Sequence, residues 1–468
     1  MKRIIGLTAL ISICTLNFSL YAQTDKGGIS KEMLQSVRQS YRETPEMKAL
    51  QNAIGGNDIN KLALNRKNIG SDTYFSHRVN SKGITDQKSS GRCWAFTGMN
   101  VLRAKVIAKY NLNEFQFSIN YIFFWDQLEK ANLFLQAIID TRSKPMEDKT
   151  VEWLFKNPIG DGGQFTGIVN LVTKYGAVPQ EIMPETHSSS NTARMSQLLS
   201  LKLKEFALQL RETDKSGKNI QTATLMQKKT EMLGVIYRML VLNLGEPPSE
   251  FTWTQKDVNG KPVSTKTYTP LSFYTEFVDV DMSDYVMIMN DPTREYNKVY
   301  EIEYDRHVYD GYNWKYLNLP IEEVKKMAIA SIKDSTMLYF SCDVGKFLNR
   351  ETGFLDVHNY DYASLMGTDF TMNKKQRIQT FSSGSSHAMT LCAVDLDEQE
   401  NPKKWLLENS WGATYGYKGF LVMTDEWFDE YMFRLVVDKK YIPENIRELL
   451  TQKPILLPPW DPMFSMEE

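Results

Sequence analysis

The stretch Gln87-Lys88-Ser89-Ser90-Gly91-Arg92-Cys93-Trp94 decides how the rest of the sequence is interpreted. It reads as a turn-rich loop, and apolar residues follow it at helical spacing, at Phe96, Met99 and Leu102. Cys93 is therefore predicted at the N-terminus of a helix. A thiol is a strong nucleophile only as the thiolate, which the positive end of a helix dipole stabilises. The stretch thus predicts a reactive cysteine.

The same loop supplies a second chemical group. Gln87 lies six residues before Cys93, and its side-chain amide can fold back beside the thiol. Together with the backbone N–H of Cys93 it would form a two-donor oxyanion hole for a tetrahedral intermediate. Gly91 permits the close backbone turn that this arrangement requires.

A nearby imidazole must come from another part of the chain. His387 begins a predicted strand just after the Ser- and Gly-rich stretch 382–386, and Asn409 ends the next predicted strand. An antiparallel pairing of these strands would bring Asn409 beside His387, where its amide oxygen can orient the imidazole. Trp411 would shield that hydrogen bond from water. These residues predict nucleophilic catalysis by a thiol.

The composition is that of a large folded protein. The chain has 468 residues, of which 42% are hydrophobic and 12% aromatic, so a largely disordered chain is excluded. Lys and Arg (55) nearly balance Asp and Glu (57), and the formal net charge is −2. Nothing in the overall charge therefore calls for a nucleic acid or a membrane surface as partner.

The N-terminus predicts export. Lys2 and Arg3 precede an apolar stretch that ends at Ala22, after which the chain becomes polar. We expect residues 1–22 to be a signal peptide that is removed, leaving a soluble periplasmic or extracellular protein that is not bound to a membrane. The alternative is an uncleaved membrane anchor, which N-terminal sequencing would reveal.

The cysteines do not predict a disulfide framework or a metal site. After signal removal three remain, Cys93, Cys342 and Cys392, so at least one thiol stays free. Cys342 and Cys392 lie in apolar stretches that read as buried strands. No CxxC motif or Cys–His ligand spacing supports zinc, and we expect no metal and no organic cofactor.

The order of the predicted elements indicates an α+β fold. Residues 23–80 form a polar N-terminal arm, helices dominate from Cys93 to about residue 245, and strands dominate the last third. A basic helical region at about 190–250 reads as an insertion. The stretch from Pro454 to Pro462 holds four prolines, which exclude a helix or a central strand, so it should be an extended arm.

Taken together, the motifs resemble the papain-like cysteine peptidases, which carry the same signatures in the same order. The matching residues are Gln87, Gly91-Arg92-Cys93-Trp94, Gly162-Gly163, His387 and Asn409-Ser410-Trp411-Gly412. Within that superfamily the chain is similar to the branch of bleomycin hydrolase and bacterial aminopeptidase C. The stretches that carry this likeness include Phe123-Phe124-Trp125-Asp126, Asp161-Gly162-Gly163-Gln164, Cys342-Asp343-Val344-Gly345-Lys346 and Leu457-Pro458-Pro459-Trp460-Asp461-Pro462-Met463. The likeness runs from about Ser81 to Met463.

The resemblance implies a papain-like peptidase domain over residues 81–463, with a helical half, an antiparallel β half and the basic insertion. It implies an aminopeptidase that acts on peptides and assembles as a hexamer. Cys93, His387, Asn409 and Gln87 would be catalytic. Substrate would bind at Gly162, Gly163 and Trp411. It would also bind at Glu468, because the tail, residues 464–468, would lie near the cleft.

Some features depart from that family. Ser385-Ser386 stands where the family usually has a Met-Thr pair, which should change the subsite lining more than the chemistry. The family is mostly cytosolic, and the ending Phe464 to Glu468 is bulkier and more acidic than usual.

Two other functions stay open at this point. One is an endopeptidase or another acyl-transferring thiol enzyme with the same catalytic residues. The other is a nucleic-acid-binding protein that uses the basic insertion.

Overall fold

The computed structural model describes residues 27–68, 70, 72–80, 82–215, 222–313 and 315–462. The chain divides into two compact units, Met1–Leu62 and Ala63–Glu468. The predicted signal peptide, residues 1–22, and the predicted tail, residues 464–468, lie outside the described residues. No helix in the described part of the chain is both long enough and apolar enough to cross a membrane.

The described part of the first unit, residues 27–62, is helical. It contains α1 (Lys31–Ser40) and α2 (Pro45–Gly56), and α3 (Ile59–Ala63) ends at the boundary. Ser30 and Thr44 cap α1 and α2 by accepting hydrogen bonds from backbone N–H groups of the first turn. Both helices are described throughout and contain no buried residue.

The second unit begins earlier than the predicted peptidase domain. Residues 63–80, which we assigned to the arm, belong to this unit. Strand β1 (His77–Arg78) pairs with β10 (His387–Leu396), and the Val79 N–H donates to the Cys392 carbonyl at 2.8 Å. Because this pairing is with a strand more than 300 residues away, no local pattern marks it.

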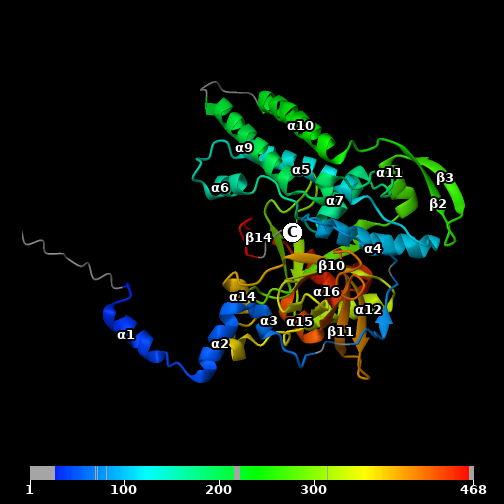
Figure 1. The fold of residues 1–468 in the computed structure, drawn as a ribbon. Helices are drawn as coiled ribbons and strands as arrows, with labels where there is room; N and C mark the ends of the chain where they lie inside the picture. Colours follow the sequence, from blue (N-terminus) through cyan, green and yellow to red (C-terminus); the bar gives the residue numbers. More distant parts are fainter. Residues whose placement is uncertain are drawn as a thin grey trace, which may run out of the picture. The chain divides into compact units, whose positions relative to one another are not determined.

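The helical half of the second unit is built around α4 (Cys93–Tyr110), which is apolar on nearly all sides and therefore buried. Around it lie α5 (Ile119–Asp140), α6 (Lys149–Lys156) and α7 (Phe165–Tyr175). Figure 1 shows α5 and α7 on one side of α4 and the strands β10 and β11 (Pro402–Glu408) on the other.

The predicted insertion consists mainly of two long antiparallel helices. They are α9 (Ala193–Lys215) and α10 (Thr222–Leu244), which pack on α5, and the short α8 (His187–Ser190) precedes them. A hairpin of β2 (Phe251–Lys256) and β3 (Pro262–Tyr268) follows, and then α11 (Pro270–Ser272) and a π-helical segment, Phe273–Val278.

The β half is a large mixed sheet. Its strands lie in the order β14-β5-β6-β4-β13-β7-β10-β11-β12-β9-β8. The remaining bounds are β4 (Tyr285–Met289), β5 (Lys298–Ile302), β6 (Lys315–Asn318), β7 (Leu338–Cys342), β8 (Leu348–Asn349), β9 (Phe354–Leu355), β12 (Phe420–Thr424), β13 (Met432–Asp438) and β14 (Ile455–Leu457). Most neighbours are antiparallel, as predicted, but the short pairings β4–β6, β9–β12 and β5–β14 are parallel.

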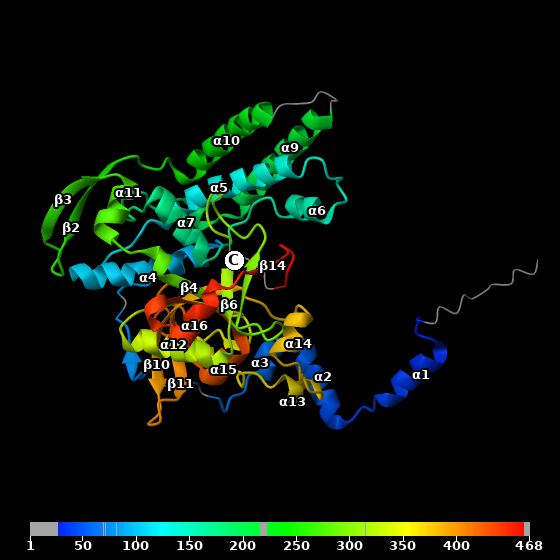
Figure 2. The same ribbon diagram turned by 180° about the vertical axis from the view of Figure 1, so that it is seen from behind.

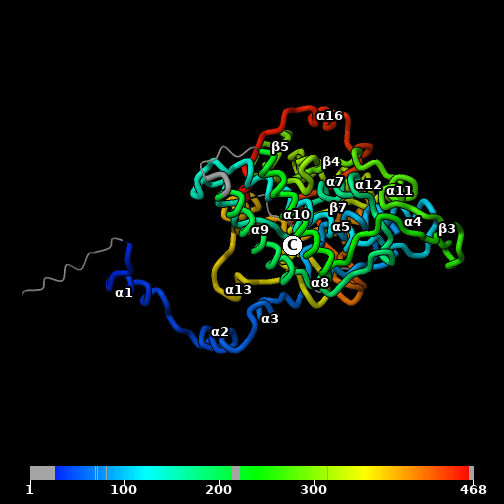
Figure 3. Tube along the Cα trace, turned by 90° about the horizontal axis from the view of Figure 1, so that it is seen from above, coloured from blue at the N-terminus to red at the C-terminus, as the bar shows by residue number. Residues whose placement is uncertain are grey.

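Short helices complete the β half, and the C-terminal segment then runs along the edge of the sheet. The helices there are α12 (Ile321–Lys333), α13 (Tyr362–Met366), α14 (Lys374–Gln379), α15 (Asp425–Tyr431) and α16 (Glu444–Arg447). Figures 2 and 3 show the C-terminal segment passing from α16 to β14, beside β5. As the prolines predict, it is an extended arm that reaches only the edge of the sheet.

Candidate active site

Cys93 is the first residue of α4, as predicted, and its side chain is buried. The first N–H groups of a helix have no partner within the helix, so the Cys93 N–H belongs to the set that can bind an anion. The helix therefore offers the thiol its positive end and offers an oxyanion a backbone donor.

His387 and Asn409 come together as predicted. His387 is the first residue of β10, Asn409 directly follows β11, and these strands are antiparallel neighbours. The His387 ring nitrogen Nε2 lies 2.8 Å from Asn409 Oδ1. Because an amide oxygen only accepts, Nε2 carries the proton and Nδ1 is the nitrogen that can exchange a proton with a thiol.

Trp411 and Gln87 join this group. The Trp411 ring stacks on the His387 ring, with centroids 4.8 Å apart and planes at 30°. Gln87 is 4% exposed; its Oε1 accepts from the Ser410 hydroxyl at 2.6 Å and its Nε2 donates to the Ser90 carbonyl at 2.7 Å. An amide nitrogen has two N–H bonds, so this contact uses one of them.

Gly162 and Gly163 belong to a segment that packs against the start of α4, the helix that begins with Cys93. A Cβ at Gly163 would stand 2.6 Å from the Trp94 ring and 2.4 Å from His307 Cε1, so the chain can approach this closely only as glycine. The Gly162 carbonyl accepts from Lys130 Nζ at 2.5 Å. The expected substrate-binding segment is thus packed tightly on α4.

Buried charges stabilise that segment. Lys130 Nζ lies 2.8 Å from Asp126 Oδ2, and His307 Nδ1 lies 2.5 Å from Asp126 Oδ1. Burial lowers the pKa of His307 and outweighs the opposite effect of the neighbouring Asp126 carboxylate, which favours the neutral imidazole. Burial alone would raise the pKa of Asp126, but Lys130 and His307 together hold it below the usual value. Sequence reasoning missed this cluster, because its three residues come from α5 and a distant loop.

Arg92 is a second group that sequence reasoning missed. Its guanidinium is fully buried beside Cys93 and forms a two-point ion pair with Glu185, at 2.8 and 3.2 Å. Its Nε also donates to the Ser90 hydroxyl at 3.0 Å. The loop that carries the nucleophile is therefore tied to the segment before α8.

The other two cysteines lie in strands, as predicted. Cys342 pairs in register with His387 on the neighbouring strand, and Cys392 lies in the middle of β10. Burial raises the pKa of the Cys392 thiol. Ser385, in the pair that departs from the family, donates to the Ser341 hydroxyl at 3.0 Å.

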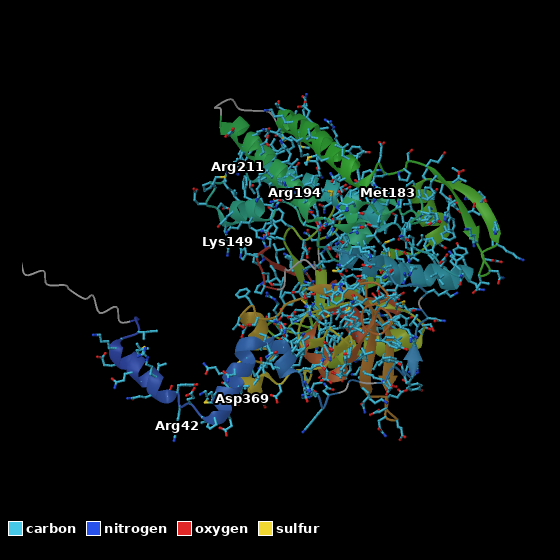
Figure 4. All side chains as sticks on the ribbon, viewed as in Figure 1. Arg42, Lys149, Met183, Arg194, Arg211 and Asp369 are labelled. Atoms are coloured by element: carbon cyan, nitrogen blue, oxygen red, sulfur yellow. The ribbon has the colours of Figure 1, made fainter. Side chains whose placement is uncertain are left out.

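The C-terminal arm has several anchors, although Glu468 itself lies outside the described residues. Strand β14 pairs with β5, and the buried Asp461 forms an ion pair with Arg294. The Lys149 ammonium lies 4.1 Å from the centre of the Trp460 ring; Figure 4 shows Lys149 on α6.

The basic insertion uses part of its charge internally. Arg211 is 4% exposed and donates to the carbonyls of Thr141 and Lys144, and the largely buried Lys229 donates to Gln136 at 2.8 Å. Figure 4 marks Arg194 and Arg211 toward opposite ends of α9. These contacts give Arg211 and Lys229 a structural role.

Within the described residues, no group of three or more His, Cys, Asp or Glu side chains is arranged so that it could hold a metal ion.

Comparisons with known proteins find relatives that match nearly the whole chain. A model described as the peptidase C1-like family matches residues 28–464. The chain is 40% identical to bleomycin hydrolase of Mus musculus, with 95% of this chain and 100% of the relative covered. It is 36% identical to aminopeptidase C of Lactobacillus delbrueckii subsp. lactis, with 94% and 98% covered. The crystal structure of PepW from Lactobacillus rhamnosis HN001 aligns with a TM-score of 0.90 at 35% identity, over 94% of this chain and 100% of that one.

Proposed function

The chain belongs to the peptidase C1-like family, and we propose that it is a thiol-dependent aminopeptidase that hydrolyses peptides through an acyl-enzyme on Cys93. The observation that carries this proposal is the His387–Asn409 hydrogen bond at 2.8 Å, which leaves Nδ1 as the proton-transfer atom. The relatives named aminopeptidase C and bleomycin hydrolase, which match nearly the whole chain, support it.

In the first half of the reaction the Cys93 thiolate attacks the substrate carbonyl. The negative charge that develops on the carbonyl oxygen is stabilised by the Cys93 N–H and by Gln87 Nε2. His387, then an imidazolium, donates its proton to the leaving amine, and the amine departs from the acyl-enzyme.

In the second half His387 acts as a base. It takes a proton from water, the water oxygen attacks the thioester carbonyl, and the same oxyanion donors stabilise the second tetrahedral intermediate. The thiolate then leaves, and the N-terminal amino acid of the substrate is released with a free carboxylate. Asn409 keeps the imidazole in the required tautomer throughout.

The preference for free N-termini is the finer part of the proposal. The arm is anchored at β14 and Asp461. From the family resemblance we expect the five residues from Phe464 onward, which lie outside the described residues, to block the non-primed side of the cleft. A carboxylate there, from Glu468, would pair with the α-ammonium of the substrate, a charge-assisted contact worth about 1.5–3 kcal/mol.

Two matched enzymes test this preference. The full-length protein and a variant lacking residues 464–468 are compared on an aminoacyl fluorogenic peptide and on its N-acylated form. We expect the deletion to slow hydrolysis of the free peptide and to speed cleavage of the blocked one. An equal ratio for both enzymes would mean that the arm does not gate the cleft, and the exopeptidase assignment would lose its physical basis.

The proposal extends to export and assembly. The mature protein begins at Gln23 outside the cytoplasm, and it is a hexamer. N-terminal sequencing of the native protein tests the first statement, and an intact Met1 would contradict it. Sedimentation analysis of the mature protein tests the second.

A further inference from the structure

Asp161 lies between three structures that the reaction requires. It immediately precedes Gly162–Gly163. Its backbone carbonyl accepts a hydrogen bond at 2.8 Å from Nε1 of Trp94, the residue that follows Cys93. Its side-chain oxygen Oδ2 accepts from the Gly91 N–H at 3.3 Å, at the end of the loop that starts at Gln87.

The same carboxylate also binds the start of the inserted helices. Oδ2 accepts from the Thr192 hydroxyl, and Oδ1 accepts from the Ser196 hydroxyl at 2.5 Å. Thr192 directly precedes α9 and Ser196 lies in its first turn, where a negative charge is favourable. The insertion also contacts the loop through its backbone, since the Ser89 N–H donates to the Ser190 carbonyl at 3.0 Å.

Lys130 holds the Gly160–Gly163 segment from another direction. Its ammonium donates to the Gly160 carbonyl at 3.1 Å and to the Gly162 carbonyl at 2.5 Å. With these carbonyls bound to α5, the segment that carries Asp161 has little freedom to follow a displaced loop. The hydrogen bond from the Gly91 N–H to Asp161 therefore holds Gly91 in place.

We propose that Asp161 is a positioning residue. It fixes the loop from Gln87 to Gly91 relative to Gly162–Gly163 and to α9, and it thereby fixes the position of the oxyanion hole. This inference rests on the proposed peptidase activity. It assigns the inserted helices a part in catalysis, because Thr192 and Ser196 complete the coordination of the carboxylate.

The test compares Asp161→Ala with Asp161→Asn in the full chain. An asparagine whose oxygen takes the place of Oδ2 can still accept from Gly91 and Thr192, and its NH₂, in the place of Oδ1, can donate to the Ser196 hydroxyl oxygen. We expect Asp161→Ala to lower kcat by about 10²-fold, the cost of a misplacement of about 1 Å, and Asp161→Asn to restore most of the turnover. Ser188→Ala is the control and should stay close to wild type, because the Ser188 hydroxyl donates to Asn243 at 2.9 Å and not to Asp161.

A second readout separates positioning from loss of structure. Alkylation of Cys93 by iodoacetamide needs the thiolate but forms no oxyanion, so its rate should change little in Asp161→Ala. Parallel loss of alkylation and turnover, or equal inactivity of the Asn and Ala variants, would overturn the inference. So would wild-type turnover in Asp161→Ala.

A further variant is used if Asp161→Ala does not fold. Thr192→Val combined with Ser196→Ala leaves Asp161 bound only to Gly91 and should lower kcat several-fold with alkylation unchanged; unchanged kcat in this double variant would also overturn the inference. An inactive wild-type enzyme that is still alkylated at Cys93 would instead refute the proposed function.

Discussion

Cys93 at the start of α4 and Cys392 in the middle of β10 are equally buried, at 0% exposure, yet their surroundings differ. Cys93 lies at a helix N-terminus, whose dipole favours a thiolate. The Cys392 thiol donates to the Leu406 carbonyl at 3.4 Å, and burial raises its pKa. Burial by itself therefore does not decide whether a thiol reacts; the groups that can stabilise its charge do.

The largest expected effect comes from removing the helix-terminal thiol. Cys93→Ala should lower kcat/KM by about 10⁴-fold or more, because no other group can form the acyl-enzyme. Hydrolysis of an aminoacyl fluorogenic peptide measures the loss, and circular dichroism checks that the variant is folded. Retained hydrolysis would show that Cys93 is not the nucleophile. Cys93 and Cys392 would then no longer differ in catalytic role.

Removing the imidazole should be the next largest change. His387→Ala should lower kcat by about 10²–10⁴-fold, because it removes the acid and base of both half-reactions. The pH profile of kcat/KM should also lose the limb that His387 controls. A variant that keeps the wild-type profile would show that another group transfers the proton.

Gln87→Ala tests the oxyanion donor. It should lower kcat by about 10²–10³-fold with little change in KM, since the donor acts on charge that develops in the transition state. Steady-state kinetics on one substrate separates the two constants. If the variant chiefly raises KM, Gln87 binds the ground state and the role assigned to it is wrong.

Asn409→Ala should be milder than His387→Ala, because the imidazole remains and only its orientation is lost. The two variants are measured side by side at the same pH. Equal losses would mean that the imidazole cannot act at all without the hydrogen bond from Nε2 to Asn409.

Cys392→Ala should have the smallest effect on catalysis. Turnover should match the wild type, while the free energy of unfolding falls by about 1 kcal/mol through the lost packing in β10. Thermal unfolding measures the second quantity. Iodoacetamide should label Cys392 only after unfolding, because burial raises its pKa; labelling in the native protein would erase the distinction from Cys93.

Much of the site could be predicted because its signals are local. The turn-rich loop before a helical pattern places Cys93 at a helix start, and the strands around His387 and Asn409 read clearly as strands. One antiparallel pairing then suffices to bring the two residues together. The pairing needs only a short connection, so few topologies compete with it.

The buried charged residues that hold the site in place could not be predicted in this way. Arg92 pairs with Glu185, which lies 93 positions later, and His307 lies 181 positions after Asp126. Periodicity and motif spacing carry no information about such pairs, since many charged residues are available to each one. Residues 63–80 were assigned to the arm for the same reason, because β1 is only two residues long and has no pattern of its own.

The sequence by itself determined the chemistry of this protein: which residue is at a helix start, which histidine begins a strand, and which glycines precede α7. Short-range backbone preferences specify these features. Only the tertiary structure decided how that chemistry is held. Asp161 acquires its partners Gly91, Thr192 and Ser196 when the insertion folds against the loop. These partners lie 70, 31 and 35 positions from Asp161, so short-range preferences cannot specify the contacts.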